Sequence, residues 1–200
     1  ILRLQQRQTP WDIAVIGGGA TGVGVAMDAA SRGLDVVLID QSDFGKGTSS
    51  RSTKLVHGGV RYLRQGNVTL VRDALKERSI LRAAAPDLVH ELAFLIPCRS
   101  VWQRILYWVG MKVYGLLAIG DQFQGSRGVS SNEAARLVPE IGRSQLRGGV
   151  IYHDGQFDDA RLLIQMAKAA AKEDACLINY VAAVELMKND NGQCIGIEAV

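Results

Sequence analysis

The chain has 200 residues, 48% of them hydrophobic, which is enough to bury a substantial core. Its formal net charge of only +3 is far from the basic excess of a nucleic-acid-binding domain, so we expect no nucleic-acid partner. The three cysteines form no Cys-x-x-Cys pair, which argues against a disulfide scaffold and a metal site and indicates a reducing compartment. We find neither the apolar core of a signal peptide nor an uncharged run long enough to span a membrane.

After a loose leader at residues 1–11, residues 12–40 predict a strand, a helix and a second strand. Apolar runs at 13–16 and 36–39 have the composition of buried parallel strands. The helix-compatible segment between them ends at Gly33, because glycine suits a helix C-cap. This order predicts an α/β fold with a Rossmann-like domain.

Glycines in a Gly-x-Gly-x-x-Gly frame join the first strand to the helix. Gly17 permits the tight turn, Gly19 lets a pyrophosphate approach the backbone, and Gly22 lets the helix pack closely on the strand. The first helical residues, Ala20 and Thr21, offer N–H groups to the diphosphate. The frame therefore predicts a dinucleotide-binding site.

Asp40 ends the second strand, where a carboxylate accepts a hydrogen bond from a ribose 2′-hydroxyl and disfavours a 2′-phosphate. Glycine, serine and threonine dominate the loop at 45–53, whose N–H groups and hydroxyls suit a phosphate or the edge of a flat ring. Its candidate binding residues are Thr48, Ser49 and Ser50.

A glycine pair, Gly58-Gly59, follows this loop. Four cationic or aromatic residues surround the pair within a stretch of nine: Lys54, His57, Arg61 and Tyr62. Such a segment lets a flat group approach the backbone, although a basic surface loop has the same composition.

Two helices are expected next, and they differ in character. Residues 68–84 predict a charge-laced structural helix without a site, and 91–97 a short apolar strand. Residues 101–119 predict a helix that either lies in a membrane interface or covers a sheet. The segment 99–149 has seven basic and three acidic residues, which favours the membrane. The apolar face of the helix would consist of Val101, Trp102, Ile105, Leu106, Val109, Val113, Leu116 and Leu117.

The last third of the chain predicts a strand near 150–152, a turn at Asp154-Gly155 and a helix capped by Asp158 or Asp159. His153 is expected to be a turn histidine, with a role as general base as the alternative. Two strands joined by the turn at 189–192 end the chain.

Three blocks resemble the FAD-dependent glycerol-3-phosphate dehydrogenases of the D-amino-acid-oxidase-like flavoprotein group. They are GGGATG, DFGKGTSSRSTKLVHGGVRYL and YHDGQFDDARL. The resemblance implies FAD as cofactor and oxidation of sn-glycerol 3-phosphate to dihydroxyacetone phosphate by hydride transfer, with quinone as electron acceptor. It also implies peripheral attachment to the inner face of the cytoplasmic membrane, and a homodimer is a candidate assembly.

The resemblance gives roles to individual residues. Arg61 would bind the substrate phosphate or the developing oxyanion, for which its two-pronged guanidinium is suited. Tyr62 would donate a hydrogen bond beside it. His57 would lie against the flavin, where it could also serve as the catalytic base, although a residue outside this chain is an equal candidate. The remaining candidate FAD contacts are Lys54, Leu55 and Val184.

The resemblance also predicts how the chain is divided into domains. After the leader, we expect the first part of the FAD-binding domain at 12–90, a mixed-sheet substrate or cap domain at 91–149, and a return to the FAD-binding domain at 150–200. Because the chain lacks an initial methionine and ends within an expected strand, we expect a part of a longer polypeptide. The resemblance implies a second flavin-contacting glycine segment in a C-terminal half, so we expect this chain alone to bind FAD weakly or not at all.

Three alternatives stay open. The first is a related flavin oxidase acting on amines or amino acids, which the Arg61-Tyr62 pair disfavours. The second is a non-catalytic FAD-binding fragment. The third is an NAD-dependent enzyme, which the long Ser/Thr-rich loop after the second strand disfavours.

Overall fold

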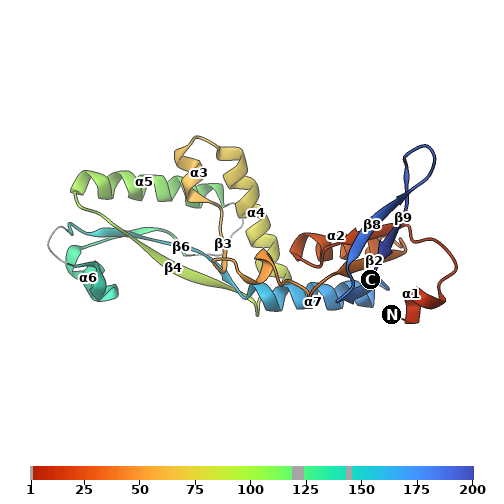
Figure 1. The fold of residues 1–200 in the computed structure, drawn as a ribbon. Coiled ribbons are helices and arrows are strands. Elements are labelled where there is room, and N and C mark those ends of the chain that lie inside the picture. The colour runs from red at the N-terminus through yellow and green to blue at the C-terminus, as the bar shows by residue number, and fades with distance from the viewer. Residues whose placement is uncertain (1, 119–123, 143–145) are drawn as a thin grey trace. The chain divides into compact units, whose positions relative to one another are not determined.

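The computed structural model describes residues 2–118, 124–142 and 146–200. The chain divides into two compact units (Figure 1). Unit 1 consists of Ile1–Thr53 and Asp158–Val200, and unit 2 of Lys54–Phe157. Each unit has its own sheet and its own core, and each is described separately below.

Unit 1 contains a parallel sheet of three strands in the order β1-β2-β7. Its β1 pairs with β2 from Ile13 opposite Val36 to Ile16 opposite Ile39. The strand–helix–strand prediction is therefore confirmed, and Gly33 has the positive φ of +82° expected after a helix end. The elements of this unit are α1 Leu2–Gln6, β1 Ile13–Ile16, α2 Ala20–Ser31, β2 Val36–Asp40, the 3-10 turn η1 Thr48–Ser50, α7 Asp159–Lys172, β7 Cys176–Asn179, β8 Ala183–Lys188 and β9 Cys194–Ala199.

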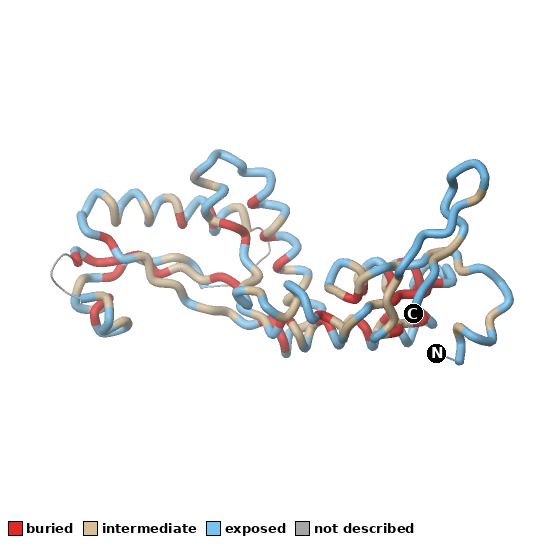
Figure 2. The backbone as a smooth tube through the Cα atoms, viewed as in Figure 1, coloured by how far each residue is buried: buried red, intermediate tan, exposed pale blue. Residues whose placement is uncertain are grey.

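Apolar layers cover both faces of this sheet. Figure 2 colours the buried residues of the chain red. Helices α2 and α7 pack on one face, where Val36 and Leu38 of β2 meet Leu163 of α7. On the other face, Val37 and Ile39 contact Trp11 and residues of the β8–β9 hairpin. Central strand β2 thus alternates its side chains between two apolar layers, as a doubly covered parallel strand does.

Two expectations for unit 1 need correction. The run 13–16 is not fully buried: among the described residues β1 pairs with β2 alone, and its side chains alternate between half-buried and exposed. The leader is not entirely loose, since it contains α1 and Arg7 forms an ion pair with Asp35 at 2.6 Å. The Arg7 guanidinium lies 4.0 Å from the ring centre of Trp11, which fixes the entry to β1.

Unit 2 contains an antiparallel sheet built around the long strand β6, which pairs with β3, β4 and β5. All strand pairs of this sheet that the structure describes are antiparallel. Helices α3, α4 and α5 pack on one face through residues such as Leu75 and Tyr114, and α6 packs on the other. The elements are β3 Leu55–Val56, α3 Val60–Arg64, α4 Val68–Ala84, β4 Val89–Pro97, α5 Val101–Leu117, β5 Arg127–Val129, α6 Ser131–Leu137, the 3-10 turn η2 Pro139–Ile141 and β6 Gly149–Phe157.

The turn predicted at Asp154-Gly155 is wrong. Both residues lie inside β6, where Asp154 is opposite Leu92 and Gly155 opposite Glu91 of β4. The backbone continues straight because the ladder with β4 runs through the whole of β6. His153 is therefore a strand residue rather than a turn histidine, and its Nδ1 lies 3.2 Å from the backbone oxygen of Gln124.

Helix α5 has two apolar faces, and only one of them is covered. Met111 and Tyr114 are buried against the sheet, with Tyr107 packed beside them. Seven of the eight residues of the predicted apolar face are exposed, Trp102 at 80% and Leu116 at 76%, while Leu117 packs on the core. The helix thus covers the sheet, while its broader face is exposed. None of the helices in the described ranges is long and apolar enough to cross a bilayer.

The compact units divide the chain at positions 53/54 and 157/158, whereas the predicted functional domains change at 90 and 150. Segment 54–90 packs with unit 2 because β3 pairs with β6 and α4 joins the core of that sheet. Compactness and function are different properties, so the assignment of these segments to FAD or substrate binding stays a prediction.

Candidate functional site

The Gly17–Gly22 loop adopts the shape that its glycines predict. Gly17 has φ +109°, a conformation that side-chain-bearing residues rarely adopt, and its N–H donates to the Ile39 backbone oxygen at 2.8 Å. A Cβ added at Gly22 would lie 1.9 Å from the Gly17 oxygen and 3.3 Å from Cγ1 of Val15. The turn and the close helix–strand packing therefore both require glycine.

Asp40 holds this loop from the end of β2. Its Oδ2 accepts from the Gly18 N–H at 2.6 Å, and its Oδ1 accepts from the Ser42 N–H at 2.7 Å. Each carboxylate oxygen has a second lone pair, so Asp40 can support the loop and still accept from a ribose hydroxyl. Asp40, the predicted partner of the ribose, therefore also stabilises the glycine loop through hydrogen bonds.

The Ser/Thr-rich loop reaches the start of α2. Ser49 Oγ accepts from the Ala20 N–H at 2.9 Å, and the Ser52 hydroxyl donates to Asp159 Oδ2 at 2.6 Å. The loop is thereby attached to the first turn of one helix and to the start of α7. Thr48 and Thr21 are exposed at this edge, whereas Ser49 and Ser50 are half-buried.

The residues of unit 1 fit a dinucleotide cofactor. The helix start combines backbone N–H groups with the positive end of the helix dipole, which favours a diphosphate. At Gly19 an added Cβ would meet Ser49 Oγ at 3.3 Å, so a side chain at this position would press on the Ser/Thr-rich loop. The predicted set Gly17, Gly19, Ala20 and Ser49 lies together at this one helix start.

In unit 2, His57 is tied to the glycine pair that follows it. The Gly59 N–H donates to His57 Nδ1 at 2.9 Å, and Gly59 has φ +68°. Since the donor is a backbone N–H, Nδ1 is unprotonated, and the proton of the neutral ring is on Nε2. In this geometry His57 can donate a hydrogen bond through Nε2, but it has no free lone pair with which to act as a base.

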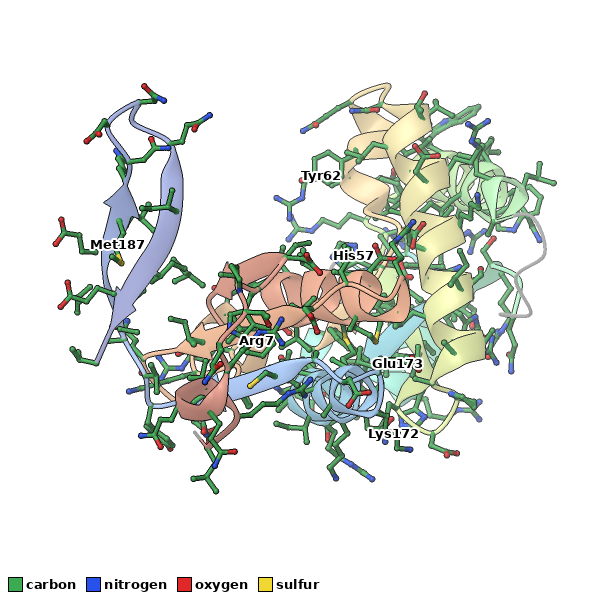
Figure 3. The ribbon with its side chains drawn as sticks, turned by 90° about the vertical axis from the view of Figure 1, so that its right-hand side faces the viewer. Arg7, His57, Tyr62, Lys172, Glu173 and Met187 are labelled. Carbon is green, nitrogen blue, oxygen red and sulfur yellow. The ribbon has the colours of Figure 1, made fainter. Side chains whose placement is uncertain are left out.

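Arg61 and Tyr62 follow in the first turn of α3, and both are exposed. Tyr62 projects from α3, and His57 lies in the segment leading to it (Figure 3). A Cβ at Gly59 would lie 2.7 Å from Cδ2 of Tyr62, so the ring packs over the glycine backbone. The structure therefore brings His57, Arg61 and Tyr62 together around one constrained turn.

The other candidate residues are distributed over both units. Leu55 of β3 pairs with Gln156, and the Lys54 carbonyl accepts from the Phe157 N–H at 3.0 Å. Lys54 has a positive φ of +60°. Val184 of β8 is exposed and lies where the β8–β9 register shifts, so a contact of its backbone with adenine stays a prediction.

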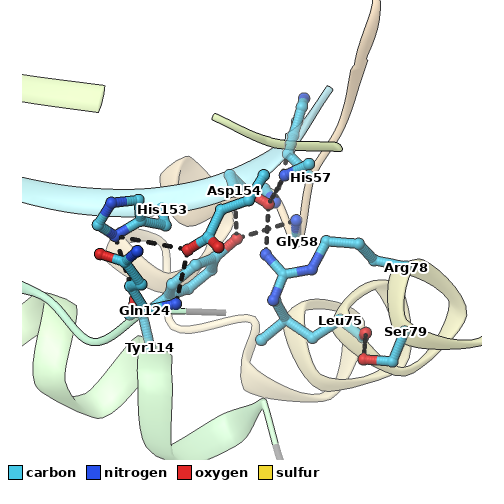
Figure 4. Close-up of polar contacts among 12 residues, drawn as sticks. His57, Gly58, Leu75, Arg78, Ser79, Tyr114, Gln124, His153 and Asp154 are labelled. Atoms are coloured by element: carbon cyan, nitrogen blue, oxygen red, sulfur yellow. Dashed lines mark hydrogen bonds and ion pairs between the residues drawn. The ribbon is translucent and has the colours of Figure 1, made fainter. Parts of the chain in front are cut away.

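The sequence interpretation missed a buried polar cluster in unit 2 (Figure 4). Arg78 of α4 forms an ion pair with Asp154 Oδ1, and the Tyr114 hydroxyl donates to Asp154 Oδ2 at 2.7 Å. Their exposed fractions are 2% for Arg78 and 3% for Tyr114 and Asp154. Burial, followed by the charge of Asp154, raises the pKa of Tyr114. A signal was present: Arg78 follows buried Val71 and Leu75 at helical spacing, on the inner face of α4.

A glycine-rich turn between a parallel strand and its helix, followed by an acid at the end of the next strand, defines a dinucleotide-binding unit. Residues 12–200 match the DAO family of FAD-dependent oxidoreductases. The chain belongs to this family, whose cofactor is FAD.

Curated relatives and solved structures agree with this assignment. The mitochondrial glycerol-3-phosphate dehydrogenase of Arabidopsis thaliana is 45% identical over 192 residues, covering 90% of this chain and 30% of that protein. The Homo sapiens mitochondrial enzyme is 42% identical over 195 residues, covering 94% and 27%. The glycerol-3-phosphate dehydrogenase of Bacillus halodurans, solved with FAD, superimposes with a TM-score of 0.71 at 30% identity, covering 98% and 31%. The chain thus spans less than a third of the length of each.

Proposed function

We propose that the protein containing this chain oxidises sn-glycerol 3-phosphate to dihydroxyacetone phosphate with FAD. The observation that carries the proposal is the exposed Arg61-Tyr62 pair, presented by the first turn of α3 directly after the constrained glycine pair. A guanidinium beside a phenol hydroxyl suits a small phosphorylated alcohol. Relatives at 42–45% identity that bear the name glycerol-3-phosphate dehydrogenase support this choice of substrate.

Separate groups of residues in this chain would bind the cofactor and the substrate. The Gly17–Gly22 loop and the start of α2 would hold the diphosphate of FAD, and Asp40 would accept from its ribose. FAD, when bound, supplies the acceptor for the hydride that leaves C2 of the substrate. Arg61 would bind the substrate phosphate or the oxyanion that develops at C2, and Tyr62 would donate a hydrogen bond beside it.

His57 has a narrower role in this proposal than the sequence allowed. Because its Nδ1 already accepts from the Gly59 N–H, the ring offers the Nε2–H as a donor to FAD or substrate. The proton of the C2 hydroxyl therefore goes to a group other than His57. The pH dependence of kcat/KM would report the pKa of that group.

The test is the visible spectrum of the full-length protein before and after anaerobic addition of glycerol 3-phosphate. Bleaching of the flavin band by this substrate is the expected result. Bleaching by amines or amino acids instead, with glycerol 3-phosphate inactive, would establish the oxidase alternative. A protein that holds FAD and is bleached by neither class would overturn the proposed activity.

A membrane surface and a quinone acceptor belong to the same proposal. The uncovered face of α5 presents Trp102, Leu106 and Leu116 at exposures of 67–80%, and Lys112 lies on the same helix. A cationic helix with exposed tryptophans suits the interface of an anionic bilayer, where a quinone is accessible. The Arabidopsis thaliana and Homo sapiens relatives are mitochondrial, so the proposal specifies a membrane surface rather than the cytoplasmic membrane.

Cosedimentation of the full-length protein with anionic vesicles tests this surface. We expect Trp102→Glu to weaken binding, because it places a charge in the apolar face. Ile80→Glu is the matched control, since Ile80 is an exposed apolar residue of α4. Equal binding of the two variants would remove α5 from the interface, and size-exclusion chromatography of the same samples would test the predicted homodimer.

A further inference from the structure

We propose that Tyr114, Asp154 and Arg78 form a positioning relay that fixes the turn at His57–Gly59 and, through it, the Arg61-Tyr62 pair. The inference rests on the proposed function for its catalytic consequence and on the contacts of unit 2 for its structural part. All three residues are buried, and Arg78 and Tyr114 also line a pocket within unit 2. They would act through the backbone of the turn.

The hydrogen bonds of the relay have a fixed direction (Figure 4). The Gly58 N–H donates to the Tyr114 hydroxyl oxygen at 2.9 Å, and the hydroxyl donates its single proton to Asp154 Oδ2 at 2.7 Å. Asp154 Oδ1 accepts from Arg78 and from the Gly155 N–H at 3.0 Å. A backbone N–H of the turn is thus linked through a phenol to a charged pair.

The relay is built from three elements that are distant in sequence. Arg78 comes from α4, Tyr114 from α5 and Asp154 from β6. Because each element belongs to the packed core of unit 2, the relay transmits the position of that core to the turn. The turn is therefore positioned by tertiary structure as well as by its own glycines.

The contact between turn and core is as close as glycine allows. A Cβ at Gly58 would lie 2.5 Å from Cδ2 of Leu75 and 2.6 Å from the Tyr114 hydroxyl. The next residue, Gly59, is left-handed and donates to His57 Nδ1, and α3 begins immediately after it. A shift of Gly58 would therefore move both the His57 ring and the base of α3.

The Tyr114 hydroxyl is protonated in the folded protein. Burial and the neighbouring carboxylate of Asp154 raise the pKa of its hydroxyl, so the neutral form persists at physiological pH. The hydroxyl is already donated to Asp154 and already accepts from Gly58. Tyr114 is thus a positioning residue and not a proton donor in the reaction.

The first test is Tyr114→Phe in the full-length protein, which removes the hydroxyl and keeps the ring. We expect kcat/KM for glycerol 3-phosphate to fall by about 10- to 100-fold at unchanged FAD content, the range expected for a misplaced binding group. Tyr152→Phe is the matched control, because Tyr152 packs edge-on against Tyr114 in the same core. Unchanged kcat/KM in Tyr114→Phe, or an equal loss in the control, would overturn the proposal.

A double-mutant cycle separates positioning from a general loss of structure. If the relay acts through Arg61, Tyr114→Phe should reduce kcat/KM much less when Arg61 is already lysine, since interacting sites are non-additive. A loss by the same factor in both backgrounds would show that Tyr114 does not act through Arg61.

Amide hydrogen exchange tests the relay independently of the reaction. In Tyr114→Phe we expect faster exchange in peptides spanning 55–63, with peptides from β4 unchanged. Unchanged exchange at the turn would overturn the relay even in an active enzyme. Faster exchange in a protein that does not oxidise glycerol 3-phosphate would support the relay and overturn only the proposed function.

Discussion

Ser49 Oγ accepts a hydrogen bond from the backbone N–H of Ala20 at 2.9 Å, so a loop hydroxyl occupies the first turn of α2. This N–H belongs to the group of helix-start donors that would hold a diphosphate. A serine and a phosphate oxygen would therefore compete for the same donor, or share the space around it. The free energy of unfolding is the quantity that distinguishes these cases.

Ser49→Ala should destabilise the FAD-free protein by about 1 kcal/mol, because a helix-start N–H loses its acceptor. If the diphosphate takes over the Ala20 N–H, the difference should shrink in the FAD-bound protein. Thermal unfolding of the wild type and of Ser49→Ala, each with and without FAD, measures this difference. Thr69→Ala is the control, since Thr69 is an exposed residue of α4 outside the candidate cofactor site. An equal loss in both forms would mean that Ser49 keeps the N–H when FAD is bound.

Gly22→Ala should abolish stoichiometric FAD binding. The new Cβ would lie 1.9 Å from the Gly17 oxygen, so either the phosphate loop or α2 must move. Overpacking of this kind typically costs about 1–3 kcal/mol. Flavin absorbance of the purified full-length protein, together with its unfolding midpoint, measures both effects.

Gly24→Ala provides the matched control on the same helix. Its Cβ would meet Met166 Cε at 3.6 Å, an ordinary contact. Alanine is favoured over glycine inside helices by about 1 kcal/mol, so this variant should be slightly more stable and bind FAD normally. Loss of FAD in both variants would show that the binding defect of Gly22→Ala does not come from its contact with Gly17.

Arg61→Lys should lower kcat/KM for glycerol 3-phosphate by about 10-fold or more at unchanged flavin content. Lysine keeps the charge but loses the two-pronged geometry that suits a phosphate. Steady-state kinetics measures the effect, and Arg72→Lys on the exposed face of α4 serves as control. Kinetics equal to those of the control would remove Arg61 from the substrate site.

Alkaline pH should destabilise the protein through Tyr114. Its pKa is raised in the folded state, so the protonated form stabilises the fold fully below the unfolded pKa of about 10 and progressively less above it. The free energy of unfolding, measured from pH 8 to 11, should fall less steeply in Tyr114→Phe than in the wild type. Identical slopes would contradict the assignment.

Local sequence patterns predicted unit 1 well. The helix, the glycine turn and both strands of 12–40 lie within one short segment, and each residue type there has a direct conformational reason. The burial of β1 could not be predicted in the same way, because it depends on which strands lie beside it. Apolar composition alone cannot distinguish a central strand from an outer one.

The relay in unit 2 shows what local patterns miss. Asp154 follows a histidine and precedes a glycine, which resembles a turn, yet the nine-residue ladder with β4 keeps it in a strand. Its partners lie 76 and 40 residues away in the chain, at Arg78 and Tyr114. Sequence alone leaves helix α5 ambiguous for a related reason: it has two apolar faces, and only the packed structure shows which one is covered.

The broad outer face of α5 also affects how the protein can be handled. In lipid-free buffer, a surface centred on Trp102, Leu106 and Leu116 favours contact between molecules. Purification should therefore yield a mixture of aggregates unless a mild detergent or a nanodisc covers this helix. Dispersity measured by light scattering with and without detergent would show how strongly this one helix determines colloidal behaviour.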